Sequence, residues 1–128
     1  MEELERYAKG LEVRRAVLGD KHVNRSLEKM DSFTEEFQDL VTRYAWGEMW
    51  TRPGLPRPTR SLITLAMLVA LNRGDEFKLH LRGAVNNGVP RDQIKELLLQ
   101  AAVYCGVPAA NSAFRAADEV FAEQERRA

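Results

Sequence analysis

The chain has 128 residues, which is enough for one domain and too short for two of ordinary size. Its 19 basic and 19 acidic residues give a formal net charge of zero, which argues against a nucleic-acid-binding protein and gives no sign of attraction to an anionic membrane. The single cysteine, Cys105, excludes an intrachain disulfide and a zinc site with several cysteine ligands.

We expect no secretory signal peptide, because the N-terminal segment is charged and lacks an apolar core. No stretch reaches the roughly 18 apolar residues of a membrane span. The longest apolar run, residues 62–71, is interrupted by Thr64 and fits a buried helix better. We therefore expect a cytoplasmic protein that makes no contact with a membrane.

The first predicted helix covers residues 1–18, where apolar side chains recur at helical spacing. Gly19 follows the last apolar residue and is expected to end this helix. Residues 20–31 are polar and show no such periodicity, so they are predicted to form a loop.

A capping box marks the start of the second predicted helix. Ser32 and Glu35 match the pattern Ser-x-x-Glu in front of an apolar rhythm, so we predict a helix from there to about Trp46. The segment from Trp46 to Thr59 holds three prolines and two glycines and is predicted to be irregular. Because it also holds both tryptophans, we expect it to pack against another part of the protein.

Four further helices are predicted in the second half of the chain. The first of them is apolar on nearly all sides, which is typical of a helix at the centre of a bundle or an oligomer. Two Gly-Val-Pro sequences, at 88–90 and 106–108, separate the last three. The charged tail from Glu123 to Ala128 is expected to fray. The four predicted helices span 59 or 60 to 71, 75–87, 92–105 and 109–124.

No segment alternates as a strand would, so the prediction is a single all-α domain over residues 1–128. A chain of this length has little core with which to cover a helix that is apolar all round, such as residues 61–71. We therefore expect the protein to associate with copies of itself.

One polar stripe is predicted along the helix at 75–87. At 100° per residue, side chains three or four positions apart share a face. This stripe borders an apolar one that contains Phe77 and Leu81, so a small pocket could form at the edge of the core. The polar stripe reads Arg73, Glu76, His80, Gly83 and Asn87.

Three stretches resemble the carboxymuconolactone decarboxylase family. Two strings within them are unusual, Trp46-Gly-Glu-Met-Trp50 and Tyr104-Cys-Gly-Val-Pro-Ala-Ala-Asn111, and the similarity covers nearly the whole chain. The resemblance implies a six-helix domain that assembles into a ring, typically a hexamer, and that needs no cofactor. The stretches are 13–23, 42–55 with 59–62, and 80–89 continuing into 104–111.

The same superfamily contains the alkylhydroperoxidase D-like thiol peroxidases, whose motif is Cys-x-x-Cys-x-x-x-His with a glycine eight residues after the histidine. His80 matches the motif histidine, but Arg73 and Glu76 occupy the cysteine positions and Ser61 replaces the upstream glutamate. Peroxidase chemistry needs a thiolate and a resolving thiol. The sequence therefore disfavours that activity.

The resemblance implies a small dicarboxylate lactone, 4-carboxymuconolactone, as the substrate. Its ring carboxylate leaves as carbon dioxide, and the electrons flow through the ring double bond to the lactone carbonyl. Proton return then yields 3-oxoadipate enol-lactone, a step of the protocatechuate branch of the beta-ketoadipate pathway. The substrate carries its own electron sink, so the expected enzyme is a carboxy-lyase without metal or organic cofactor.

Such a site needs an acid and a donor to the developing oxyanion. His80 can serve as either, although a lone histidine can equally be a structural one. Glu48 lies between two tryptophans, and apolar surroundings would raise its pKa and suit it to carry a proton. Alternatively, Glu48 pairs with Arg52 or Arg60. Glu76, one turn from His80, is a candidate to orient it.

The site also needs a cation for the carboxylate that stays on the substrate, for which arginine is best suited. Arg60 and Arg73 are the candidates, with ion pairing to Glu76 or Asp75 as the alternative. Trp46 and Trp50 could wall the pocket, or one of them could belong to the core. The catalytic candidates are therefore His80, Glu48 and Glu76, and the substrate-binding candidates are Arg60, Arg73, Trp46 and Trp50.

Two other reactive side chains are predicted to be structural. His22 follows a polar segment, and Cys105 lies on the apolar face of its helix as a small buried hydrophobe.

The alternatives to the decarboxylase are a non-enzymatic scaffold domain and a related small-molecule lyase on the same fold. The polar stripe beside an aromatic, proline-rich segment argues against a purely structural role.

Overall fold

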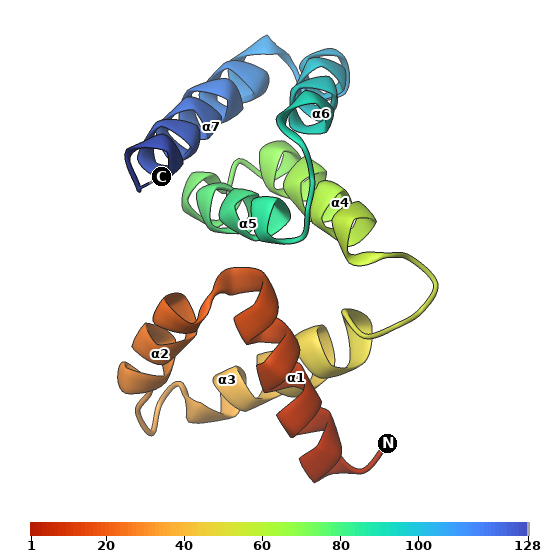
Figure 1. Cartoon of the computed structure of the whole chain (residues 1–128), viewed down its shortest axis with the longest axis vertical. Coiled ribbons are helices and arrows are strands. Elements are labelled where there is room, and N and C mark those ends of the chain that lie inside the picture. Colours follow the sequence, from red (N-terminus) through yellow and green to blue (C-terminus); the bar gives the residue numbers. More distant parts are fainter. Residues whose placement is uncertain (128) are drawn as a thin grey trace. The chain divides into compact units, whose positions relative to one another are not determined.

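The computed structural model describes residues 1–127, which form helices and turns and contain no strand, as the all-α prediction requires. Contacts divide the chain into two compact units, Met1–Arg57 and Pro58–Ala128 (Figure 1). None of the helices in the described part has the length and hydropathy of a transmembrane span. The prediction of a single domain stays a prediction.

The first unit contains three α-helices and a π-helical segment. Helix α1 packs against η1 more extensively than any other pair of elements does (Figure 1). Val13, Val17 and Trp46 form the buried core at this contact. The elements are α1 (Glu3–Leu18), α2 (Asp20–Glu28), α3 (Glu35–Leu40) and η1 (Val41–Met49).

Two glycines allow the backbones of α1 and η1 to approach closely. A methyl group added at Gly10 would overlap the carbonyl oxygen of Thr42, and one added at Gly47 would overlap the carbonyl oxygen of Arg6. Each helix thus contributes one glycine to the crossing. The first unit therefore depends on backbone packing that no larger side chain permits at these positions.

The predicted loop at 20–31 is wrong, because residues Asp20–Glu28 form helix α2. Its sequence is polar, but Val23 is fully buried and provides the apolar anchor. Gly19, at φ 90°, turns the chain between α1 and α2. Asp20 lies in the first turn, where its negative charge interacts favourably with the helix dipole and stabilises the helix.

The predicted capping box is also wrong. Helix α3 begins at Glu35, and its N-cap is Thr34, without a side-chain capping bond. The carboxylate of Asp31 accepts hydrogen bonds from the backbone N–H groups of Phe33 and Thr34, both at 3.0 Å, and stabilises the turn instead. The bonds from Thr34 and Phe33 lower the pKa of Asp31.

The helix predicted to run to Trp46 is an α-helix only as far as Leu40. Residues Val41–Met49 form the π-helix η1, whose wider spacing shows in the 3.0 Å bond from the Trp50 N–H to the Ala45 carbonyl. Helical structure thus extends three residues beyond Trp46, and the irregular segment is limited to residues 50–56. π-Helical segments are rare and often occur at functional sites.

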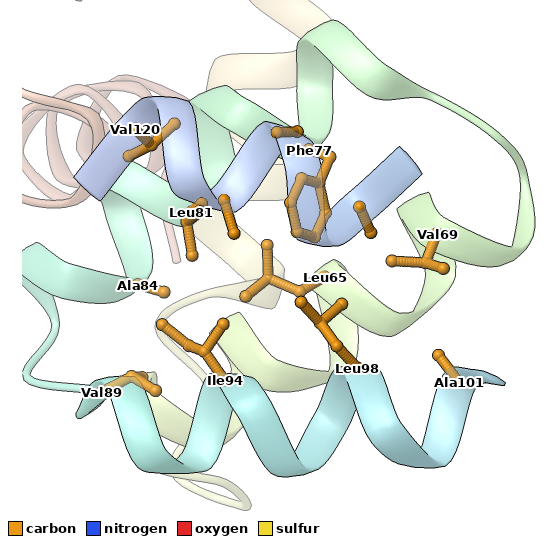
Figure 2. Close-up of a cluster of buried hydrophobic side chains, with 13 residues drawn as sticks. Leu65, Val69, Phe77, Leu81, Ala84, Val89, Ile94, Leu98, Ala101 and Val120 are labelled. Carbon is orange, nitrogen blue, oxygen red and sulfur yellow. The ribbon is translucent and has the colours of Figure 1, made fainter. Parts of the chain in front are cut away.

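The second unit confirms the four predicted helices to within three residues at each end. Their apolar side chains form one core, with Leu65, Leu81 and Leu98 at or near zero exposure (Figure 2). Gly88 and Gly106, with φ of 87° and 100°, separate the last three helices. The helices are α4 (Arg57–Ala70), α5 (Gly74–Asn86), α6 (Arg91–Tyr104) and α7 (Val107–Arg127).

The tail is more ordered than its charge suggested, since α7 runs to Arg127. Glu123 accepts from Arg82 of α5 at 3.1 Å, and Arg91 pairs with Glu125 at 2.9 Å. These ion pairs connect the last turns of α7 to other helices. The expectation of fraying is therefore wrong for the described residues of the tail.

Two apolar positions of this unit are exposed in the single chain. Helix α4 buries one face, which includes Leu65 and Val69, and leaves Met67 58% exposed. Cys105 is exposed, so the prediction of a buried thiol is wrong. Helix α6 ends at Tyr104, and Cys105 therefore lies beyond the apolar face that the helical spacing assigned to it.

Candidate functional site

The two tryptophan rings stack on each other, Trp46 within η1 and Trp50 directly after it. Trp46 is 4% exposed and belongs to the core of the first unit, whereas Trp50 is half-buried. Their ring centroids are 5.0 Å apart, with 25° between the ring planes. Trp46 is thus the tryptophan that belongs to the core, a role that the sequence suggested for one of the two. Trp50 supplies the more accessible aromatic surface.

Glu48 has a cationic partner that the sequence did not suggest. Its Oε2 lies 3.6 Å from Nε of Arg6, and its side chain is 45% exposed. Arg6 also pairs with Glu3 and lies over the ring of Tyr44 at 5.2 Å. Burial lowers the pKa of Arg6, but Glu3, Glu48 and Tyr44 together raise it by more. Glu48 is therefore not in the apolar setting that its tryptophan neighbours implied.

The polar stripe of α5 becomes more buried toward the C-terminal end of the helix. Arg73 precedes the helix and Glu76 lies in its first turn, and both are exposed. His80, in the middle, is half-buried, and Gly83 is buried. His80 is thus partly withdrawn from water while the two charged residues are solvated.

A hydrogen bond attaches the end of this stripe to α4. The Nδ2 of Asn87 donates to Oγ of Ser61 at 2.9 Å, and Ser61 is 2% exposed. The sequence had identified both residues, Asn87 as part of the stripe and Ser61 at a motif position, but gave no sign that they were bonded to each other. The bond holds the face that carries His80 at a defined distance from α4.

The two arginine candidates differ in their surroundings. Arg60, next to Ser61 on α4, is half-buried, and its carbonyl accepts from Oγ1 of Thr64 at 2.9 Å. Arg73 is exposed at the start of α5. A guanidinium that has lost part of its hydration binds a carboxylate more strongly than an exposed one does. Arg60 is thus the better placed of the two.

The structure brings the candidates together in two groups. Trp46 and Glu48 lie on η1 of the first unit and Trp50 directly follows it, whereas the arginines and the α5 stripe belong to the second. Among residues 1–127, no group of three or more histidine, cysteine or carboxylate side chains could hold a metal ion. The candidate side chains carry imidazole, carboxylate, guanidinium and indole groups.

Comparison with known proteins matches residues 35–119 to the carboxymuconolactone decarboxylase family. The chain is 56% identical to the 4-carboxymuconolactone decarboxylase of Acinetobacter baylyi over 94% of its own length and 90% of that protein. It is 46% identical to a nitrosuccinic acid decarboxylase of Metarhizium robertsii over 80% of its own length and 71% of that protein. A 4-carboxymuconolactone decarboxylase of Pseudomonas putida is 56% identical over 38% of this chain and 100% of the other.

Proposed function

The chain belongs to the carboxymuconolactone decarboxylase family, and we propose on that basis that it converts 4-carboxymuconolactone to 3-oxoadipate enol-lactone and carbon dioxide. The observation that carries this proposal is the 56% identity over 94% of the chain to a decarboxylase named for that substrate. This conclusion agrees with the family resemblance of the sequence motifs.

The reaction breaks the bond between the ring carbon and its carboxylate. The electron pair moves through the ring double bond to the lactone carbonyl, and a proton then adds to the ring carbon beside that carbonyl. We assign His80 to donate the proton or to hydrogen-bond the oxyanion, because it is half-buried and imidazole is the side chain whose ordinary pKa lies closest to neutrality. Glu76, one helical turn away, is proposed to orient it.

The remaining candidates have binding or supporting roles in this proposal. Arg60, with Arg73 as the alternative, balances the negative charge of the dicarboxylate. Trp50 offers an aromatic wall, and the stacked Trp46 holds it in place. Glu48 is the second candidate for proton transfer, and its Oε2 lies 3.6 Å from Nε of Arg6.

A second candidate substrate is nitrosuccinate, because the chain is 46% identical to the nitrosuccinic acid decarboxylase. Both named substrates carry two carboxylates, of which one leaves. Comparing kcat/KM for the two compounds distinguishes these candidates, and we expect 4-carboxymuconolactone to be preferred.

The decisive assay follows the ultraviolet absorbance of 4-carboxymuconolactone made enzymatically from 3-carboxymuconate. We expect turnover that is unchanged after exhaustive chelation with EDTA, since no group of ligands among the described residues could hold a metal. Cys105→Ser should retain most of the activity, because the thiol has no role in the proposed reaction. Turnover that EDTA abolishes and zinc or manganese restores would contradict the cofactor-free mechanism.

We further propose that the protein is an oligomer, with the hexamer favoured by the family resemblance. Tyr104 at 82% exposure and Val103 at 78% lie at the end of α6, and Met67 of α4 is 58% exposed. Between α4 and α6 lies an apolar groove of 490 Å³ whose lining includes Glu96 and no cation. Such a groove is unsuited to a dicarboxylate and suits apolar side chains of another copy.

Light scattering should therefore give a multiple of the 14.6 kDa chain mass at micromolar concentration. Val103→Glu should shift the mass downward, because it places a charge on the exposed apolar surface. Ala122→Glu, which adds the same charge on α7, should leave the mass unchanged. A monomer at all concentrations would contradict the proposal.

A further inference from the structure

Arg14 is an unusually buried cation. It lies on α1 between Val13 and Val17 and is 6% exposed. Its Nη1 donates to Oε1 of Gln38 at 3.2 Å and to Oγ1 of Thr42 at 3.4 Å, and both acceptors are neutral. Its Nε is buried and has no hydrogen-bond partner among the described residues. The guanidinium is therefore held by two long, weak contacts.

Other arginines of the first unit show the opposite arrangement. Arg6 pairs with Glu3 and Glu48, Arg15 pairs with Asp20 at 3.1 Å, and Arg43 pairs with Glu3 at 3.8 Å. All three are more exposed than Arg14. Buried charges need a counter-ion more than solvated ones do, so the most buried of these cations would be expected to have the best partner.

The missing partner is an anion. Burial lowers the pKa of Arg14, as expected of a cation that has lost its hydration, but an arginine stays protonated at neutral pH. Displacement of the Gln38 amide would free the terminal edge of the guanidinium that includes Nη1, and such an edge matches a carboxylate with two parallel hydrogen bonds. The side chain thus has the geometry and charge of a carboxylate-binding group.

We propose that Arg14 binds the carboxylate that the substrate retains. This carboxylate replaces Oε1 of Gln38 as the acceptor of the hydrogen bond from Nη1. This inference rests on the function proposed above and assigns to Arg14 the binding of the retained carboxylate, for which Arg60 and Arg73 were the candidates from the sequence. Gln38 is the half-buried partner, whereas Thr42 is 2% exposed, so the amide is the contact that a ligand displaces.

The position of Arg14 agrees with this role. Thr42 precedes Trp46 by one turn of η1, and Val13 and Val17, on either side of Arg14, pack against Trp46. The guanidinium therefore lies beside the segment that carries Trp46, Glu48 and Trp50. No carboxylate of the described residues lies within ion-pairing distance to compete with a ligand.

The reaction itself decides which carboxylate Arg14 holds. A cation paired with the departing carboxylate stabilises a charge that is lost on forming carbon dioxide, and so opposes the reaction. The retained carboxylate keeps its charge throughout, and binding it contributes equally to the substrate and the transition state. Substitutions that disturb this contact should therefore raise KM and leave kcat nearly unchanged.

Gln38→Glu is the sharpest test, because it places a permanent carboxylate beside Arg14 at almost no change in size. We expect the melting temperature to rise and KM for 4-carboxymuconolactone to increase by about tenfold or more, with kcat within about twofold of wild type. Gln124→Glu on α7 makes the same chemical change away from Arg14 and should leave KM unchanged. A folded Gln38→Glu protein with wild-type KM would overturn the proposal.

Arg14→Lys gives a second measure, since it keeps the charge but loses the planar fork. We expect a higher KM with little change in kcat, and a wild-type KM in this folded variant also counts against the proposal. If wild-type protein does not decarboxylate 4-carboxymuconolactone, the proposed function fails, and binding of succinate becomes the readout. Succinate that raises the melting temperature of wild type but not of Gln38→Glu supports the Arg14 site, and no shift in either overturns it.

Discussion

His80→Ala is expected to lower kcat for 4-carboxymuconolactone by about a hundredfold or more, the scale of a lost general acid or oxyanion donor. His80 is half-buried on the α5 stripe, and the bond between Asn87 and Ser61 holds the end of this stripe against α4. An imidazole at such a position can deliver a proton to a substrate from which water is partly excluded. KM should change less than kcat, because the effect is on the transition state.

His22→Ala is the matched control, since it removes the second histidine, on α2 of the first unit. We expect this variant to keep kcat within a few-fold of wild type. Circular dichroism and light scattering on both variants separate loss of chemistry from loss of fold or assembly. Wild-type kcat in a folded His80→Ala oligomer would refute the site assignment and leave the family membership intact.

Gly10→Ala is expected to destabilise the protein by roughly 2 kcal/mol or more. Alanine is intrinsically better in a helix by about 0.5–1 kcal/mol, but the added methyl group would overlap the carbonyl oxygen of Thr42 on η1. Because that obstacle is backbone, relief requires α1 and η1 to separate. The separation would also disturb the contacts of Arg14 with Gln38 and Thr42.

Urea denaturation followed by far-ultraviolet circular dichroism measures this effect. Gly54→Ala is the control in the same unit, because a methyl group there meets no atom within 4 Å. We expect the midpoint to fall clearly for Gly10→Ala and to stay near wild type for Gly54→Ala. Equal midpoints for Gly10→Ala and wild type would show that the close crossing of α1 and η1 is not required for stability.

The sequence was sufficient for the helices of the second unit. Their apolar residues recur at i, i+3 and i+4, as in Ile94, Leu98 and Ala101 of α6, and all three are buried. Glycine and proline then mark the boundaries, as Gly88 and Gly106 do with positive φ. These signals act between residues close in the chain, so they can be identified without knowledge of the fold. The family could also be recognised from motifs such as Trp46-Gly-Glu-Met-Trp50.

Local patterns failed where stability comes from distant residues. Helix α2 has a polar sequence and forms around one buried side chain, Val23. The change from α- to π-helix at Val41 accompanies the close contact of η1 with α1, to which Gly10 and Gly47 both contribute. No periodicity within residues 33–46 encodes that contact.

The candidate site divides in the same way. His80, Glu48 and the arginines were identifiable from residue type and motif, because their chemistry belongs to the side chains themselves. The pairing of Glu48 with Arg6, the bond between Asn87 and Ser61, and the burial of Arg14 could not be identified from the sequence. Each depends on two helices meeting at a particular distance and angle. The free energy of a charge depends on what surrounds it in space, and only the tertiary structure decides those surroundings.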